Sequence, residues 1–274
     1  MAGPGAQPYD MPFAAKVGAM NTSKYVRIER TSGLLAITLA RPEKKNALTT
    51  QMYLALVEAF ELASAEPSVH VVLVDADGGD FCAGNDIADF VAMARSGQGI
   101  ESSDVFRFLR TLAVFDKPLV AAVRGRAVGI GTTMLLHCDL VYAAEDASFS
   151  TPFVDLALVP EAASSLLLPA RIGHVRAFAL FALGETLDGR AAVHCGLANA
   201  ALPAEQVTQR ARAAALALAA KPTQALQATK KLMREHARML AVIEAEGRVF
   251  ADRLMSAEAQ ATFQAFMTRR GPGP

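Results

Sequence analysis

One carboxylate and two glycine loops are the residues of this 274-residue chain whose types and spacing could do chemistry. Glu161 follows Pro160 inside the mostly apolar stretch TPFVDLALVPEAASSLLLPARIG, residues 151–173. Apolar surroundings raise the pKa of a carboxylate, which suits a general acid or base near neutral pH. The structural alternative is that an acidic residue is favoured in the first turn of a helix. This stretch alone leaves both roles open.

The glycine loops are CAGND at residues 82–86 and VGIGT at residues 128–132, and each follows an apolar segment of the kind that forms a buried strand. Such loops can direct backbone N–H groups at one point, and two converging N–H groups form an oxyanion hole. Alternatively, the glycines serve only tight turns and close packing. The spacing GRAVGIG differs from the GxGxxG of dinucleotide-binding sites, and the chain lacks GxxxxGK[ST], GxSxG and HExxH.

Composition narrows the class of protein. Apolar residues make up 52% of the chain, and 27 basic residues balance 27 acidic ones, so nucleic acid and anionic membranes are not expected as partners. The three cysteines form no CxxC pair, which predicts buried free thiols in a reducing compartment. The N-terminus lacks the continuous apolar run of a signal peptide. We therefore predict a soluble cytoplasmic protein.

The elements that position these residues follow from periodicity and turn signals. Apolar strand patterns alternate with helical ones in the first part of the chain, which predicts an α/β layered fold. After Ala163, Ala- and Leu-rich stretches predict helix after helix to the end, the last beginning at Ser256 with Ala259, Phe263, Phe266 and Met267 on one stripe. The expected elements are a hairpin of strands at 25–30 and 34–40, a helix from Gln51 to about Ala65 capped by Thr49 or Thr50, a strand at 69–77, helical segments over about 87–114 capped by Asp86, a strand at 118–125, and loop, helix and strand in turn over 126–144.

Three regions are expected along the chain. Residues 1–22 are rich in Gly, Pro and Ala and predict a flexible tail. Residues 23–204 form the core domain, and residues 205–274 form a C-terminal helical region.

Four pieces, taken in order, resemble the enoyl-CoA hydratase/isomerase, or crotonase, superfamily: RPEKKNAL, DFCAGNDI, VRGRAVGIGTTMLLHCDLVYAAEDASFSTPF and LDGRAAVHCGLANAALP. The pieces are spread over most of the chain, and their order and spacing are more specific than any one of them. The resemblance implies a spiral core of strand-strand-helix turns, a C-terminal helical region that trimerises, and an acyl-CoA thioester as ligand.

Site residues follow from the same resemblance. The N–H groups of an oxyanion hole fall on Asn85 and Ile130, the latter a departure from the glycine that the family often has. Lys44 and Lys45 match the region that receives coenzyme A, or are ordinary solvated charges. Phe266 and Arg270 match the part of the last helix that closes over coenzyme A. Alternatively, Phe266 belongs to an apolar stripe that packs on the core, and Arg270 lies at the solvated end of the helix. The residues matched to the acyl-CoA surface are Lys44, Asn46, Ala47, Leu48, Ala83, Asn85, Ile87, Phe153 and Phe266.

The two glutamates of a typical hydratase are missing, because their positions fall on Thr133 and Phe153. The segment TPFVDLALVPEAASS is most similar to the peroxisomal-type 3,2-trans-enoyl-CoA isomerases, whose glutamate base falls on Glu161. In that family a glycine follows the base, whereas this chain has Ala162. A double-bond shift needs only one base, which removes a proton from C2 and returns it at C4. Asp155 is the reserve candidate for this role.

The resemblance therefore implies an enzyme that converts a 3-enoyl-CoA into the conjugated 2-enoyl-CoA, in the fatty-acid metabolism of β-oxidation. Coenzyme A is part of the substrate, and neither a metal nor a redox cofactor is expected. A homotrimer or a dimer of trimers is expected, with no nucleic-acid or membrane partner. The alternatives are a hydratase or another crotonase-type reaction, such as ring opening of an aromatic-catabolism thioester, and a non-catalytic acyl-CoA-binding protein.

Overall fold

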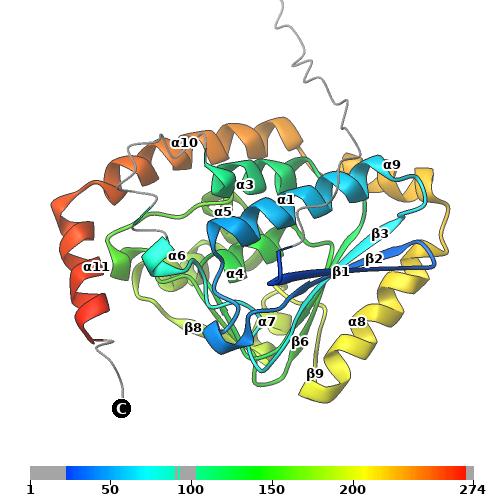
Figure 1. The fold of residues 1–274 in the computed structure, drawn as a ribbon, viewed down its shortest axis with the longest axis horizontal. Helices are drawn as coiled ribbons and strands as arrows, with labels where there is room; N and C mark the ends of the chain where they lie inside the picture. The colour runs from blue at the N-terminus through cyan, green and yellow to red at the C-terminus, as the bar shows by residue number, and fades with distance from the viewer. Residues whose placement is uncertain (1–22, 90–91, 93–102, 270–274) are drawn as a thin grey trace, which may run out of the picture.

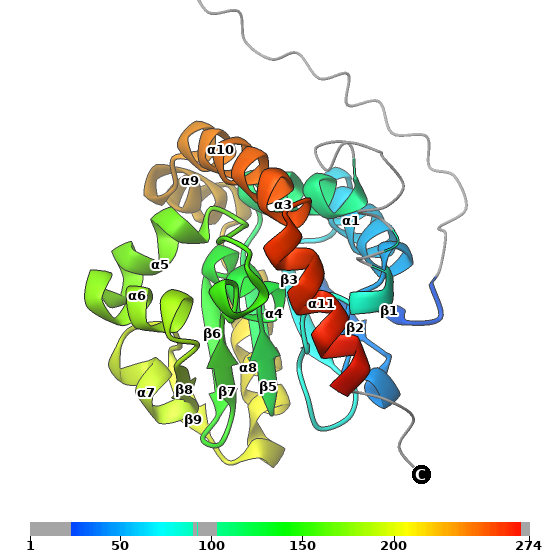
Figure 2. The same cartoon turned by 90° about the vertical axis from the view of Figure 1, so that its left-hand side faces the viewer.

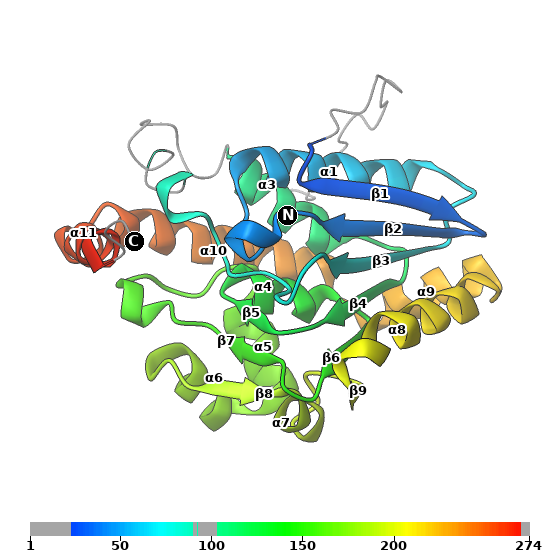
Figure 3. The same ribbon diagram turned by 60° about the horizontal axis from the view of Figure 1, so that its bottom comes forward.

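The structure is a computed structural model, and it describes residues 23–89, 92 and 103–269. Two sheets organise the described part of the chain (Figure 3). The larger has the strand order β1-β2-β3-β4-β6-β9, and the smaller has the order β5-β7-β8. The strands are β1 Val26–Thr31, β2 Leu34–Leu39, β3 Val71–Ala76, β4 Leu119–Val123, β5 Arg126–Val128, β6 Leu140–Ala144, β7 Ser148–Ser150, β8 Thr186–Asp188 and β9 Ala200–Leu202.

The pairing of the large sheet explains the sequence patterns. β1 and β2 form the predicted antiparallel hairpin, with Val26 opposite Leu39, and its turn uses left-handed Ser32 and Gly33. The remaining neighbours in this sheet pair in parallel. All residues of β2 and β4 are buried, as expected for strands covered on both faces, and they therefore show no alternation of apolar and polar residues.

Helices cover both faces of the large sheet. In the view of Figure 1, α1 (Thr50–Ala65) and α3 (Asp104–Val114) lie above it and α8 (Ala204–Ala219) lies below it, against β3, β4 and β6. The side chain of Thr49 caps α1 by accepting from the backbone N–H of Met52, as predicted. Rings of Tyr53, Phe60, Phe108 and Phe115 pack where α1 meets α3.

The C-terminal part wraps back over the core. Helix α10 crosses the molecule beside α3 and α5, and α11 then runs along one end of the molecule, where it contacts η4 (Figures 1 and 2). The remaining elements are η1 Pro42–Lys44, α4 Ile130–Thr133, η3 Met134–His137, η4 Val154–Leu156, α5 Ser164–Ile172, α6 His174–Ala182, α7 Gly189–His194, α9 Thr223–Met233, α10 His236–Leu254 and α11 Ala257–Arg269.

Two predictions about the elements were wrong. Residues 126–128, expected in a loop, form β5, and the expected run of helices after Ala163 is interrupted by β8 and β9. Each of these strands has three residues, which is too short for a periodic pattern. Strand β9, of Ala200, Ala201 and Leu202, has little intrinsic strand preference. Its place beside β6 is helped by the side chain of Asn199, which accepts from the N–H of Val141 at 2.7 Å.

Other expectations meet the structure as follows. Helix is present at 87–89 and 104–114 of the expected segment 87–114, while 90–91 and 93–102 lie outside the described residues, as does the tail 1–22. Asp86 caps as predicted, by accepting from the N–H groups of Ala88 and Asp89. Cys82, Cys138 and Cys195 are buried free thiols. No helix in the described segments is long and apolar enough to cross a membrane.

Candidate active site

The two glycine loops lie next to each other because short ladders join them. Cys82 donates its N–H to Arg126 and accepts from Val128, each at 2.9 Å, so the first loop runs beside β5. On its other side, Leu48 donates to Gly84 and accepts from Asp86, each at 2.8 Å. Three segments that are distant in sequence are thereby fixed side by side.

Two backbone N–H groups, those of Asn85 and Ile130, are the candidate oxyanion donors. Since Gly84 and Asp86 both bond Leu48, the N–H of Asn85 between them faces the other way. Ile130 is the first residue of α4, so its N–H has no partner within the helix. In the described part of the chain neither N–H donates to a protein acceptor, and both residues line one cavity. Such a pair can stabilise an oxyanion.

The close approach of the loops requires glycine at two positions. A Cβ on Gly131 would lie 2.5 Å from the carbonyl oxygen of Cys82. Gly84 has φ +92°, and a Cβ there would lie 3.2 Å from the carbonyl oxygen of Val128. The glycines at these two positions therefore set the separation between the candidate donors, in addition to permitting turns.

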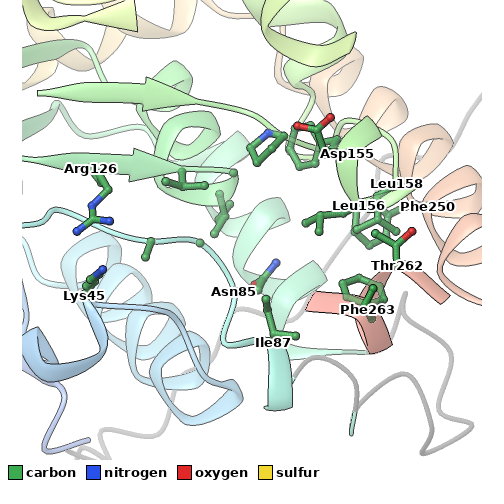
Figure 4. Close-up of a pocket in the computed structure, with 18 of the residues that line it drawn as sticks. Lys45, Asn85, Ile87, Arg126, Asp155, Leu156, Leu158, Phe250, Thr262 and Phe263 are labelled. Carbon is green, nitrogen blue, oxygen red and sulfur yellow. The ribbon is translucent and has the colours of Figure 1, made fainter. Parts of the chain in front are cut away.

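The cavity measures about 820 Å³ and differs in character from one end to the other (Figure 4). Lys45 and Arg126 lie at one end, and Asn85 lies near its middle. Apolar side chains from η4, α10 and α11 line the other end, among them Leu156, Phe250 and Phe263. The cavity can thus hold a ligand with an anionic part and an apolar part.

Glu161 and Thr133 form a buried pair beside this cavity. The hydroxyl of Thr133 donates to the carboxylate of Glu161 at 2.5 Å, and the two side chains are 0% and 7% exposed. They are not among the residues that line the cavity; their nearest lining neighbours along the chain are Ile130 and Leu158. Burial raises the pKa of Glu161 to about 8, the bond from Thr133 opposes that shift, and the charge of Glu246 adds to it.

Two further side chains organise the polar interior around this pair. Tyr53 is 1% exposed and donates its hydroxyl to the side-chain oxygen of Asn85 at 2.5 Å. Burial, followed by the charge of Glu161, raises the pKa of Tyr53 well above 10. His137 lies 2.8 Å from the carbonyl oxygen of Ala162, and burial lowers its pKa to about 3. Because a carbonyl only accepts, Nε2 of a neutral His137 donates to it and holds the segment that bears Glu161.

The residues matched to the coenzyme A surface fall into two groups. Ala83, Asn85, Ile87 and Phe153 line the cavity, and so does the reserve candidate Asp155. Lys44 is exposed on η1, Leu48 is buried in the core, and Ala47 accepts from Arg41 through its carbonyl oxygen. Phe266 lies in α11, but its side chain is outside those that the structure describes, and Arg270 lies outside the described residues.

Asn46 does not line the cavity, and its side chain instead holds neighbouring loop segments together. Its side chain is fully buried, donates to the carbonyl oxygens of Asp77 and Asp80, and accepts from the N–H of Arg41. Replacement by alanine leaves these groups unpaired, so Asn46→Ala should lower the free energy of unfolding by about 1–3 kcal/mol. Urea unfolding checks this, with exposed Glu43→Ala in the same turn expected to stay within about 0.5 kcal/mol of wild type. Equal effects of the two variants would contradict this role.

Sequence reasoning missed several residues at the site: Arg126, Tyr53, Glu246 and Phe250. Arg126 carried a usable signal, since Arg126 and Val128 sit two apart on β5 and both line the cavity, while Ala127 between them is buried. That signal required β5 to be recognised as a strand.

Comparison with known proteins identifies the family of the chain. The family model described as enoyl-CoA hydratase/isomerase matches residues 29–273. Enoyl-CoA delta isomerase 2 of Rattus norvegicus is 33% identical over 92% of the chain and 66% of its own length, and a probable enoyl-CoA hydratase of Rhodobacter capsulatus is 31% identical over 90% and 96%. The chain thus spans 66% of the rat isomerase. The solved structure of OdaA from Pseudomonas aeruginosa shares 44% identity with a TM-score of 0.86, covering 89% of this chain and 99% of that one. The predicted fold class is confirmed.

Proposed function

Because the chain belongs to the enoyl-CoA hydratase/isomerase family, we propose that it is an isomerase that moves the double bond of a 3-enoyl-CoA to the 2-position. The observation that carries the proposal is the buried carboxylate of Glu161, with a pKa of about 8, next to the paired loops of Asn85 and Ile130. A similar relative, the rat protein, carries the name of an enoyl-CoA delta isomerase.

The proposed chemistry needs one base and one anion site. The thioester oxygen accepts from the N–H groups of Asn85 and Ile130. Glu161 takes a proton from C2, the electron pair moves into the thioester, and the enolate forms. Glu161 then returns the proton at C4 while the double bond forms between C2 and C3. Only Oε1 of Glu161 accepts from Thr133, so Oε2 is the oxygen that takes the proton from C2 and returns it at C4.

The two ends of the cavity suit the two parts of such a substrate. Lys45 and Arg126 supply positive charge for the phosphate-bearing coenzyme A, although Arg126 also pairs with Asp80 at 2.8 Å. Leu156, Phe250 and Phe263 suit an apolar acyl chain. We further propose that the protein acts in β-oxidation in the cytoplasm. It should need neither a metal nor a redox cofactor, because one carboxylate completes the reaction. It should form a homotrimer or a dimer of trimers, which light scattering tests.

Hydration is the less supported reaction. Adding water to a 2-enoyl-CoA requires a group that orients and deprotonates the water and a group that protonates C2. The positions matched to the hydratase glutamates hold Thr133 and Phe153. The hydroxyl of Thr133 donates to Glu161, and the side chain of Phe153 cannot take up or release a proton. A hydratase would therefore have to work with Glu161 alone.

The deciding experiment offers wild-type protein a trans-3-enoyl-CoA and, separately, a trans-2-enoyl-CoA. Appearance of the conjugated thioester from the first, without water addition to the second, supports the isomerase. Predominant formation of a 3-hydroxyacyl-CoA makes it a hydratase. Tight binding without turnover of either makes it an acyl-CoA-binding protein.

The raised pKa of Glu161 predicts a pH dependence. A base works only when ionised, so kcat/KM for isomerisation should rise with pH through a midpoint near 8 and fall about tenfold per unit below it. Thr133→Val removes the hydrogen bond that lowers this pKa, so its midpoint should lie higher than that of wild type. Initial rates measured from pH 6 to pH 9.5 check both statements. A midpoint near the ordinary carboxyl value would contradict them.

A further inference from the structure

The segment that carries Glu161 has an unusual backbone. Between η4 and α5, Ala157, Ala162 and Ala163 all adopt left-handed conformations, with φ of 55°, 61° and 55°. Each such residue other than glycine costs about 1–2 kcal/mol. The segment therefore keeps this shape only if neighbouring groups hold it.

Helix α10 contacts this segment near both of its ends. Arg253 donates from Nε to the carbonyl oxygen of Ala157 at 3.2 Å. At the other end, the carboxylate of Glu246 accepts from the N–H of Ala163 at 2.7 Å and from the N–H of Ser165 at 2.9 Å. Glu161 lies between these attachment points.

The same face of α10 also reaches the cavity. Glu246, Phe250 and Arg253 are spaced by four and three residues, which places them on one face of a helix. Phe250, which lies between Glu246 and Arg253 in the sequence, lines the cavity (Figure 4). Gly247 lets the helix sit close to α3, since a Cβ there would lie 2.1 Å from the ring of Phe106.

Charge couples Glu246 to Glu161 as well. Both carboxylate oxygens of Glu246 accept from N–H groups, a pattern that fits the ionised form, and the N-terminus of α5 also favours negative charge there. Burial opposes this by raising the pKa of Glu246, which is 8% exposed. The polar and titratable groups that act on Glu161 are Thr133 from α4, Tyr53 from α1, Cys82 from the loop after β3, and Glu246 from α10.

We propose that Glu246 and Arg253 are positioning residues through which α10 holds the loop of Glu161 in its working conformation and sets the charge beside it. This inference rests on the proposed function for the role of Glu161. The C-terminal region then has a part in catalysis without contacting the reacting atoms, because one helix forms a wall of the cavity and fixes the base.

The test compares Glu246→Gln with Glu244→Gln, a change at an exposed position of the same helix. Glu246→Gln should lower kcat for trans-3-enoyl-CoA by about 10–100-fold, as expected when a reacting group is displaced by a fraction of an ångström to one ångström. It should also move the midpoint of the pH profile to lower pH, because a negative neighbour of Glu161 is lost. The Kd of a saturated acyl-CoA should stay within about threefold of wild type. Glu244→Gln should change none of these.

A second pair of variants tests the other attachment point. Arg253→Leu removes the bond to Ala157, whereas Glu258→Gln removes only the surface ion pair that Arg253 also makes. Arg253→Leu should lower kcat and Glu258→Gln should not, and this pair decides the inference if Glu246→Gln does not fold. If wild type is active and Glu246→Gln has the same kcat and the same pH midpoint as wild type, the inference is overturned.

Absence of isomerisation by wild type has a different meaning, because it overturns the proposed function. Hydrogen exchange of the backbone amides of residues 157–165 then decides the holding role alone. Exchange should be faster in Glu246→Gln than in Glu244→Gln, and equal exchange in the two variants overturns that role.

Discussion

Glu161→Gln is expected to lower kcat for isomerisation of a trans-3-enoyl-CoA by about 10²–10⁴-fold, the usual contribution of a positioned general base. Glutamine has nearly the shape of glutamate and can still accept from Thr133, so the buried pair keeps its packing. What is lost is the ability to take a proton from C2. Affinity for a saturated acyl-CoA should stay within about threefold of wild type, because the cavity wall is made by other residues. Stopped-flow or steady-state absorbance of the conjugated thioester, with calorimetric binding, measures both.

Asp155→Asn is the matched control for this variant. Asp155, the middle residue of η4, lines the cavity, whereas Glu161 is buried beside it, so the two carboxylates differ in environment but share a chemical class. The proposed mechanism expects near wild-type kcat from Asp155→Asn. A large loss from Asp155→Asn together with unchanged turnover by Glu161→Gln would transfer the role of base to Asp155.

The parts of this fold that could be predicted are those whose causes are local. The hairpin of β1 and β2 follows from two apolar runs and a Ser-Gly turn. Helix α1 follows from apolar residues at every fourth position, Met52, Leu56 and Phe60, after the capping Thr49. The glycine loops and Glu161 were predicted as candidate site residues from residue types and family resemblance. The geometry places Asn85 and Ile130 on one cavity and Glu161 beside it, in a position that sequence alone did not specify.

What could not be predicted depends on contacts between distant segments. Glu246 bonds backbone groups 83 and 81 residues away, and Tyr53 bonds a side chain 32 residues away. The local sequence around a glutamate in a helix does not show whether its carboxylate bonds distant backbone groups, as Glu246 does, or is solvated. Likewise, the three residues of β8 become a strand only because β7 is there to pair with them. These features are properties of the assembled fold rather than of any window of sequence.

Ile130→Pro is the second change with a large expected effect. Proline has no backbone N–H, so this substitution removes a backbone donor that other substitutions would leave in place. The loss of one oxyanion donor costs about 10²–10³-fold in kcat. Proline is tolerated at the first position of a helix, where the N–H has no helical partner, and Ile130 occupies that position in α4. Gly129, with φ 55° and ψ −119°, has the mirror image of an extended conformation, which an achiral residue can keep before proline.

The control for this variant is Ile130→Val, which keeps the N–H and removes one buried methylene. It should retain kcat within about threefold and lose only about 0.5–1.5 kcal/mol of stability. Since valine controls for apolar volume, the difference between the two variants reports the donor itself, provided that thermal unfolding shows Ile130→Pro to be folded. Equal kcat in the two variants would mean that the thioester oxygen is bound elsewhere. The pairing of Asn85 with Ile130 as an oxyanion hole would then be wrong, even if Glu161 remains the base.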